Sequence, residues 1–170
     1  MPGSSEPEPE AYVTTDELIA EARVARESFL AALAPIAPDS LTTPGLVGDW
    51  SAREIIAHLG YWAGHGTEAI HAVETGRAEQ FGMDEPSVDE VNATVARVAR
   101  QTDLGTVRRR EAASFEALVE RVAGIDPAIL PTPLPHYGLT LEGGIREDGA
   151  IHYRGHADEL RRVLTERPHG

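Results

Sequence analysis

The chain has 170 residues, a formal net charge of −13 at pH 7 and no cysteine. This length suits one domain with its own hydrophobic core. Because nucleic acid and anionic membranes are bound through basic surfaces that displace counterions, the negative charge predicts no nucleic-acid partner and no membrane partner. The absence of cysteine excludes disulfides, thiolate metal ligands and a cysteine nucleophile.

The ends of the chain and its hydropathy predict a simple organisation. Residues 1–12 are rich in Pro and Glu and lack the basic region and apolar core of a signal peptide, so they predict a flexible acidic tail. No run of apolar residues approaches the length of about 18 needed for a membrane span. We therefore expect a cytoplasmic protein with one domain over residues 13–167. Its oligomeric state stays open, with a homodimer as one alternative.

Sequence patterns mark where several helices of the domain begin. Three segments have the pattern of a capping box, in which a Ser or Thr and a Glu three residues later satisfy each other's free amides. They are Thr14–Glu17, Ser51–Glu54 and Ser87–Glu90. Apolar residues follow each box at spacings of three and four, which indicates amphipathic helices.

The helix ends follow from prolines, glycines and polar runs. The first predicted helix ends at Pro35, and the second ends between residues 67 and 75. A third, kinked or interrupted at 102–105, extends to Gly124, and a fourth begins within 140–146 and ends near Arg167. Aromatic residues make up only 5% of the chain, which disfavours a β-sandwich. The sequence predicts an all-α four-helix bundle with long inter-helix loops.

Three histidines are candidate metal ligands. His152 and His156 are four residues apart on the last predicted helix, so both rings lie on one face. That face continues into Leu160 and Val163, whose burial would also bury the rings. An unpartnered buried imidazole costs about 1–3 kcal/mol, and one shared cation would serve both. His58 lies on the apolar face of the second predicted helix. Three such ligands leave open coordination positions, as in catalytic sites that bind Zn²⁺, Ni²⁺ or Fe²⁺.

An alternative interpretation remains open for these histidines. They can equally be core or surface residues that pair with carboxylates. Asp148, Asp158 and Glu159 lie near the pair in sequence and can accept the second ring N–H of a metal ligand, or they can be solvated surface residues.

A substrate pocket is expected beside the metal. Trp62 and Tyr153 are the nearest large side chains that could form its walls, and His65 lies two turns after His58 on nearly the same face. His65 could supply acid–base chemistry there. The alternatives are that Trp62 is a core residue and that His65 is exposed. The sequence assigns no catalytic residue.

Three segments resemble a known family. Residues 48–58 (GDWSAREIIAH), 89–92 (DEVN) and 151–160 (IHYRGHADEL) are similar to the DinB-like superfamily, which includes mycothiol-dependent maleylpyruvate isomerases and related S-transferases. The likeness extends over residues 14–166. It implies an up-down-down-up bundle with a divalent metal bound by His58, His152 and His156.

The resemblance also frames the functional hypotheses. It implies a metal-dependent transferase or isomerase that joins a small-molecule thiol to a small electrophile, with the thiol supplied from outside. The maleylpyruvate isomerases have Glu at the position of His152 and a further C-terminal domain, which argues against maleylpyruvate as the substrate. A metal-dependent hydrolase of a reactive metabolite is an alternative. A non-enzymatic bundle of the ClbS/DfsB type, which sequesters a toxic small molecule, is another.

Overall fold

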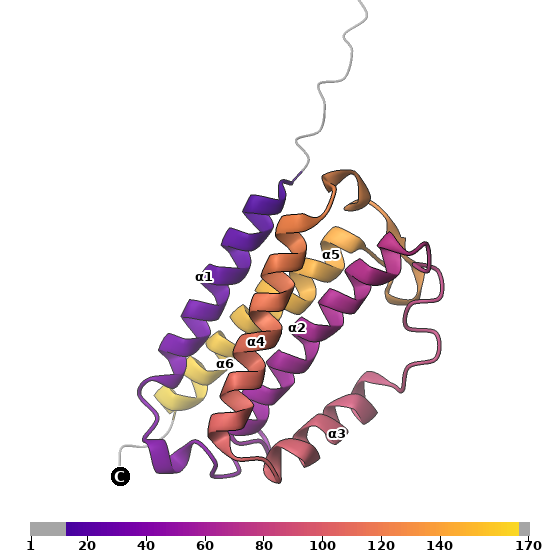
Figure 1. Ribbon diagram of the computed structural model, residues 1–170. Helices are drawn as coiled ribbons and strands as arrows, with labels where there is room; N and C mark the ends of the chain where they lie inside the picture. Colours follow the sequence, from indigo (N-terminus) through magenta and orange to yellow (C-terminus); the bar gives the residue numbers. More distant parts are fainter. Residues whose placement is uncertain (1–12, 167–170) are drawn as a thin grey trace, which may run out of the picture.

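The structure, a computed structural model, describes residues 13–166 and is built almost entirely of helices (Figure 1). The tail predicted over residues 1–12 and the last four residues lie outside the described residues. The α-helices are α1 (Thr15–Leu33), α2 (Ala52–Glu74), α3 (Val88–Arg100), α4 (Leu104–Gly124), α5 (Leu141–Arg146) and α6 (His152–Glu166). Two short strands, β1 (Pro133–Leu134) and β2 (Leu139–Thr140), pair antiparallel. No described helix combines the length and hydropathy that a membrane span requires.

The predicted capping boxes lie at the N-termini of α1, α2 and α3. Glu17 accepts a hydrogen bond from the Thr14 N–H at 2.8 Å, and Glu54 accepts one from the Ser51 N–H at 2.7 Å. These contacts satisfy amides that have no partner within their own helix. Local sequence therefore sets where these helices begin.

Four helices form the bundle. In Figure 1, α1 and α6 run in one direction and α2 and α4 in the other. This is the up-down-down-up order that the family resemblance implied, so the predicted fold class is confirmed. Its core consists of the inward faces of these helices, with Phe29, Leu59, Phe115 and Leu160 all at most 1% exposed.

The stretch from residue 88 to 124 forms two helices, where the sequence had indicated one kinked or interrupted helix. The chain reverses direction after α3, and Asp103 starts α4 by accepting a hydrogen bond from the Thr106 N–H at 2.8 Å. Helix α3 packs on α2 and lies outside the four-helix core (Figure 1). Because α3 carries the chain back toward the end of the bundle where α2 begins, α2 and α4 can lie side by side and run in the same direction (Figure 1).

The last helix is continuous but irregular. Between α5 and α6, residues Glu147–Ile151 form a π-helical turn, η4. Such turns interrupt the regular spacing of side chains along a helix and are frequent at functional sites. Here the turn contains Asp148 and comes directly before His152.

Tyr153 belongs to the core, which corrects its expected place in the pocket wall. Its side chain is fully buried, with ring centroids 5.9 Å from Phe29 and 5.4 Å from Phe115. Its hydroxyl donates to Glu111 Oε1 at 2.6 Å, and Arg26 donates to both Glu111 oxygens at 2.8 Å. The metal-ligand face and the Tyr153 face of α6 differ because adjacent helical residues point about 100° apart.

The contact between α2 and α4 depends on Gly60. A Cβ atom at this position would lie 2.9 Å from the Cα atom of Glu111, which is closer than side-chain carbons approach backbone. At Gly64, one turn later on the same helix, a Cβ atom would meet nothing within 4 Å. The two glycines therefore form a matched pair for testing the packing.

We predict that Gly60→Ala lowers the free energy of unfolding by about 1–3 kcal/mol, because the helices must separate to admit the methyl group. Gly64→Ala should raise it by about 0.5–1 kcal/mol through better helix propensity. Urea unfolding followed by circular dichroism measures both. Equal effects of the two substitutions would contradict the close packing.

Candidate metal centre

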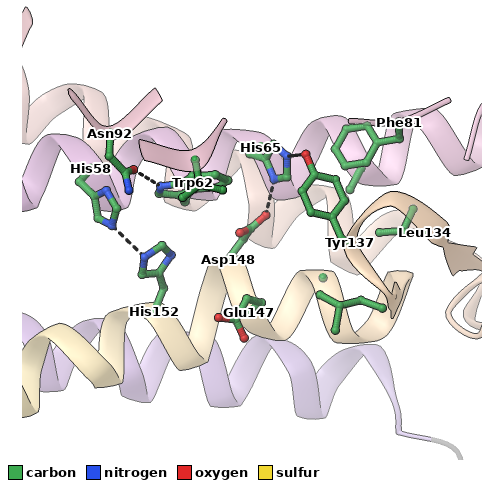
Figure 2. A pocket seen from close by; sticks show the side chains of 14 residues that line it. His58, Trp62, His65, Phe81, Asn92, Leu134, Tyr137, Glu147, Asp148 and His152 are labelled. Atoms are coloured by element: carbon green, nitrogen blue, oxygen red, sulfur yellow. Dashed lines mark hydrogen bonds and ion pairs between the residues drawn. The ribbon is translucent and has the colours of Figure 1, made fainter. Parts of the chain in front are cut away.

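Three histidines from two helices meet at one point. His58 comes from α2, and His152 and His156 come from successive turns of α6. Their potential ligand atoms lie within 4.8 Å of one another, and the Nε2 atoms of His58 and His152 are 2.8 Å apart. Figure 2 shows the rings of His58 and His152 pointing toward each other across the gap between the helices. The structure thus brings together the three ligands expected from the sequence.

These imidazoles are neutral at physiological pH. Burial and the neighbouring imidazoles lower the pKa of His58 to about 3, and burial and His156 lower that of His152 to about 4. Burial also lowers the pKa of His156, although Glu159 opposes the shift. Neutral imidazole is the form that binds a metal ion, so the protonation states suit coordination.

The hydrogen bonds of the rings also fit a metal. His156 Nδ1 lies 3.0 Å from Glu159 Oε2, which leaves Nε2 available as a ligand. The Nδ1 atoms of His58 and His152 are buried without a hydrogen-bond partner among residues 13–166. Nitrogen ligands of a tetrahedral zinc ion lie about 3.3 Å apart, a spacing that small movements of these rings would reach. The donor set could therefore hold a divalent ion.

The other two expected acceptors have different partners. Asp148 pairs with His65, with Oδ2 2.7 Å from Nδ1, and Asp158 accepts from Arg161 at 3.0 Å. Only Glu159 among the three carboxylates therefore supports a ligand ring.

A cavity of about 280 Å³ opens beside the histidines. Its polar lining comprises His58, Trp62, His65, Asn92, Tyr137, Glu147, Asp148 and His152. Its apolar lining comprises Ala69, Phe81, Val88, Leu134, Leu139 and Gly144. A small cavity whose walls combine apolar side chains with convergent polar groups is typical of a site for a small molecule.

Trp62 lies between two polar groups of this cavity. Its ring centroid is 6.3 Å from that of His58 and 4.9 Å from that of His65. Its Nε1–H donates to Asn92 Oδ1 at 3.1 Å, which links α2 to α3 (Figure 2). Trp62 is also 93% buried, so it is both a core residue and part of the cavity wall.

His65 is held on both sides. Its Nδ1 lies 2.7 Å from Asp148 Oδ2 and its Nε2 lies 3.0 Å from the Tyr137 hydroxyl. Burial by itself would lower the pKa of His65, but Asp148 and Glu85 outweigh burial and raise it. Burial raises the pKa of Asp148, and His65 opposes that shift. His65 therefore lines the cavity, as expected, but with a charge preference opposite to that of the metal-centre histidines.

Sequence reasoning did not place four of the polar lining residues in the cavity, namely Asn92, Tyr137, Glu147 and Asp148. Asn92 was noted only as part of a motif, and Asp148 was considered only as a partner for a metal ligand. Tyr137 ends a single 3₁₀ turn (Pro135–Tyr137) between β1 and β2, which is too short for any periodicity to indicate which way a side chain points.

Three solved structures share this fold. They are the colibactin self-resistance protein ClbS in complex with double-stranded DNA (TM-score 0.72, 16% identity, 92% of this chain and 98% of that chain), a Streptococcus pneumoniae protein (0.74, 11%, 92% and 93%) and an uncharacterised Escherichia coli UTI89 protein (0.75, 14%, 89% and 93%). No curated protein matches the sequence.

The ClbS complex corrects one expectation. We had excluded a nucleic-acid partner from the net charge, and that exclusion was wrong, because a protein of this fold binds double-stranded DNA. Net charge does not describe how charges are distributed over a surface.

The family comparison agrees with the fold, and its matched segment includes His58 but ends before His152 and His156. The profile described as the mycothiol maleylpyruvate isomerase N-terminal domain matches residues 22–138, which include His58 and most of the cavity lining. The match covers well over half of the chain. The chain therefore belongs to the mycothiol maleylpyruvate isomerase N-terminal domain family.

Proposed function

We propose that the protein is a metal-dependent enzyme that joins a small-molecule thiol to a small electrophile, as a mycothiol-type S-transferase or isomerase. The observation that carries the proposal is the convergence of three neutral histidines, His58, His152 and His156, of which the first two line the cavity. The family supports the thiol as co-substrate, since its description names mycothiol. The lack of cysteine means that the thiol comes from outside the chain.

In this proposal the histidines bind the metal, and other residues of the cavity bind the substrate. A divalent ion, with zinc as the first candidate, would lower the pKa of a thiol or water toward neutrality. His58, His152 and His156 would hold it through uncharged nitrogens, so the charge of the ion stays uncompensated by its ligands. Trp62 and the apolar lining exclude water and position the substrate.

Two alternatives share the same cavity. A hydrolase would use water in place of the thiol. A non-enzymatic resistance protein, by analogy with ClbS, would bind a toxic small molecule without turnover, and the DNA in the ClbS complex makes double-stranded DNA a partner to test. Thiol-dependent turnover distinguishes the proposed enzyme from both alternatives, and a mobility-shift assay tests DNA binding.

We predict about one divalent ion per chain in protein purified without an affinity tag. The double variant His152→Ala/His156→Ala should lose it, while His71→Ala, which changes an exposed histidine of α2, should retain it. Elemental analysis by mass spectrometry measures the content. Full occupancy in the double variant would exclude the proposed centre.

The lowered pKa values predict how metal binding depends on pH. Protons compete with the metal for the ring nitrogen, and for a histidine with the ordinary pKa of about 6.5 this competition begins as the pH falls below that value. With pKa values of about 3 for His58 and about 4 for His152, these rings stay neutral until the pH falls much further. We expect retention at about pH 5 and release as the pH falls through about 4. Dialysis at stepped pH, followed by elemental analysis, measures this; release near pH 6.5 would contradict it.

A further inference from the structure

The hydrogen bonds around His65 determine where its protons lie. The Tyr137 hydroxyl donates to Glu85 Oε2, so its oxygen must accept from His65 Nε2, 3.0 Å away. On the other side of the ring, the carboxylate of Asp148 accepts from Nδ1 at 2.7 Å. A carboxylate in its ionised form can only accept. With Asp148 ionised, both nitrogens of His65 carry a proton and the ring is an imidazolium, a state that Asp148 and Glu85 favour because they raise the pKa of His65.

This imidazolium connects the cavity to solvent. Asp148 is buried, whereas the side chain of Glu85 is 36% exposed. Asp148, His65, Tyr137 and Glu85 thus form a hydrogen-bonded chain from the interior to the surface, while Glu147 acts on Asp148 and Tyr61 on Tyr137 through charge alone. A proton that leaves His65 can be replaced along this chain.

His65 and the metal centre occupy opposite sides of Trp62 in the same cavity (Figure 2). A small molecule that lies along the indole ring would therefore have one end near His58 and His152 and the other near His65. One end of the cavity is suited to holding a nucleophile, and the other holds an acidic proton.

The residues that line the cavity also disfavour a negatively charged ligand. No arginine within residues 13–166 lines the cavity, so no guanidinium group is available to bind a substrate carboxylate. The charge of His65 is already balanced by Asp148 and Glu85. Burial of an unpaired carboxylate among the apolar walls would be costly.

We propose that His65 is the catalytic acid of this cavity, and that the substrates are uncharged, apolar electrophiles with an epoxide or conjugated carbonyl oxygen. The proposal rests on the function proposed above. It gives His65 a role in the chemistry and gives the electrophile a chemical class.

The step balances without any redox partner. A thiol loses its proton to solvent, and the thiolate forms a C–S bond with the electrophilic carbon. The electron pair of the C–O bond of the epoxide, or of the carbonyl π bond through conjugation, moves onto the oxygen. That oxygen takes the place of the Tyr137 hydroxyl as the acceptor of the His65 Nε2–H and receives this proton, and His65 regains a proton through Tyr137 and Glu85. The sum is addition of the thiol to the electrophile.

Binding tests the substrate class without turnover. In metal-free Trp50→Phe protein, Trp62 is the remaining tryptophan and reports ligand binding by fluorescence. We expect acetophenone, which has a carbonyl acceptor, to bind about tenfold tighter than ethylbenzene, as one hydrogen bond to a charged donor allows. Benzoate should bind more weakly than acetophenone.

Two variants test whether His65 causes the preference for acetophenone over ethylbenzene. His65→Phe keeps a ring of similar shape but has no donor, and it should bind acetophenone and ethylbenzene equally. His71→Phe, on the exposed side of α2, should behave as the parent protein. Tightest binding of benzoate, or an unchanged preference in His65→Phe, would overturn the substrate class.

Measurements of the reaction rate test whether His65 is the catalytic acid. With metal-loaded protein, styrene oxide and 2-mercaptoethanol as probes, His65→Gln should keep its metal and lose about 100-fold in rate, since an amide donates a hydrogen bond but not a proton. The rate of the parent protein should fall as pH rises through the pKa of His65, and the variant should lack that fall. An unchanged rate and pH profile in His65→Gln would overturn the acid role. Carbonyl-selective binding with no parental turnover would instead overturn the proposed function together with the acid role, and would leave the ligand class standing.

Discussion

The organisation of this protein depends on three imidazoles that share one buried space between α2 and α6. Their potential ligand atoms lie within 4.8 Å of one another, and burial together with the neighbouring imidazoles lowers the pKa of His58 and His152, so these rings are neutral. The Nε2 atoms of His58 and His152 face each other at 2.8 Å, so the two neutral rings meet through the nitrogens that are available as metal ligands. A divalent ion in this space would be coordinated by the lone pairs of these nitrogens. The bundle must hold α2 and α6 rigidly for this to work, and the close contact of α2 with α4 at Gly60 contributes to that rigidity.

The same residue type takes opposite charge states on the two sides of Trp62. His58 and His152 are surrounded by apolar groups and other imidazoles, so burial dominates and their pKa values fall. His65 is buried almost as well, but Asp148 and Glu85 face it and its pKa rises. The cavity thus combines neutral ligands for a cation with a charged proton donor. Local carboxylates, and not depth of burial, create this difference.

Different parts of the fold supply the ligands and the walls. The metal-centre histidines come from the long helices α2 and α6, which fix their spacing. Much of the remaining lining comes from peripheral elements. Val88 and Asn92 belong to α3, Phe81 to the loop before it, and Tyr137 to the loop between β1 and β2. Helices hold metal-ligand side chains at fixed positions, whereas the sequences of loops and peripheral elements can change without loss of the core. Members of this fold can therefore differ in ligand specificity while they keep the same bundle.

The sequence by itself determined what depends on neighbouring residues. Capping pairs and apolar periodicity identified the helix starts and the all-α class, and the four-residue spacing of His152 and His156 placed both on one face. Only the tertiary structure decided the reversal between α3 and α4, the inward position of Tyr153 and the pairing of His65 with Asp148 and Tyr137. His65 is 83 residues from Asp148 and 72 from Tyr137. Such contacts arise when separate helices and loops pack together, and no local periodicity encodes which side chains then meet.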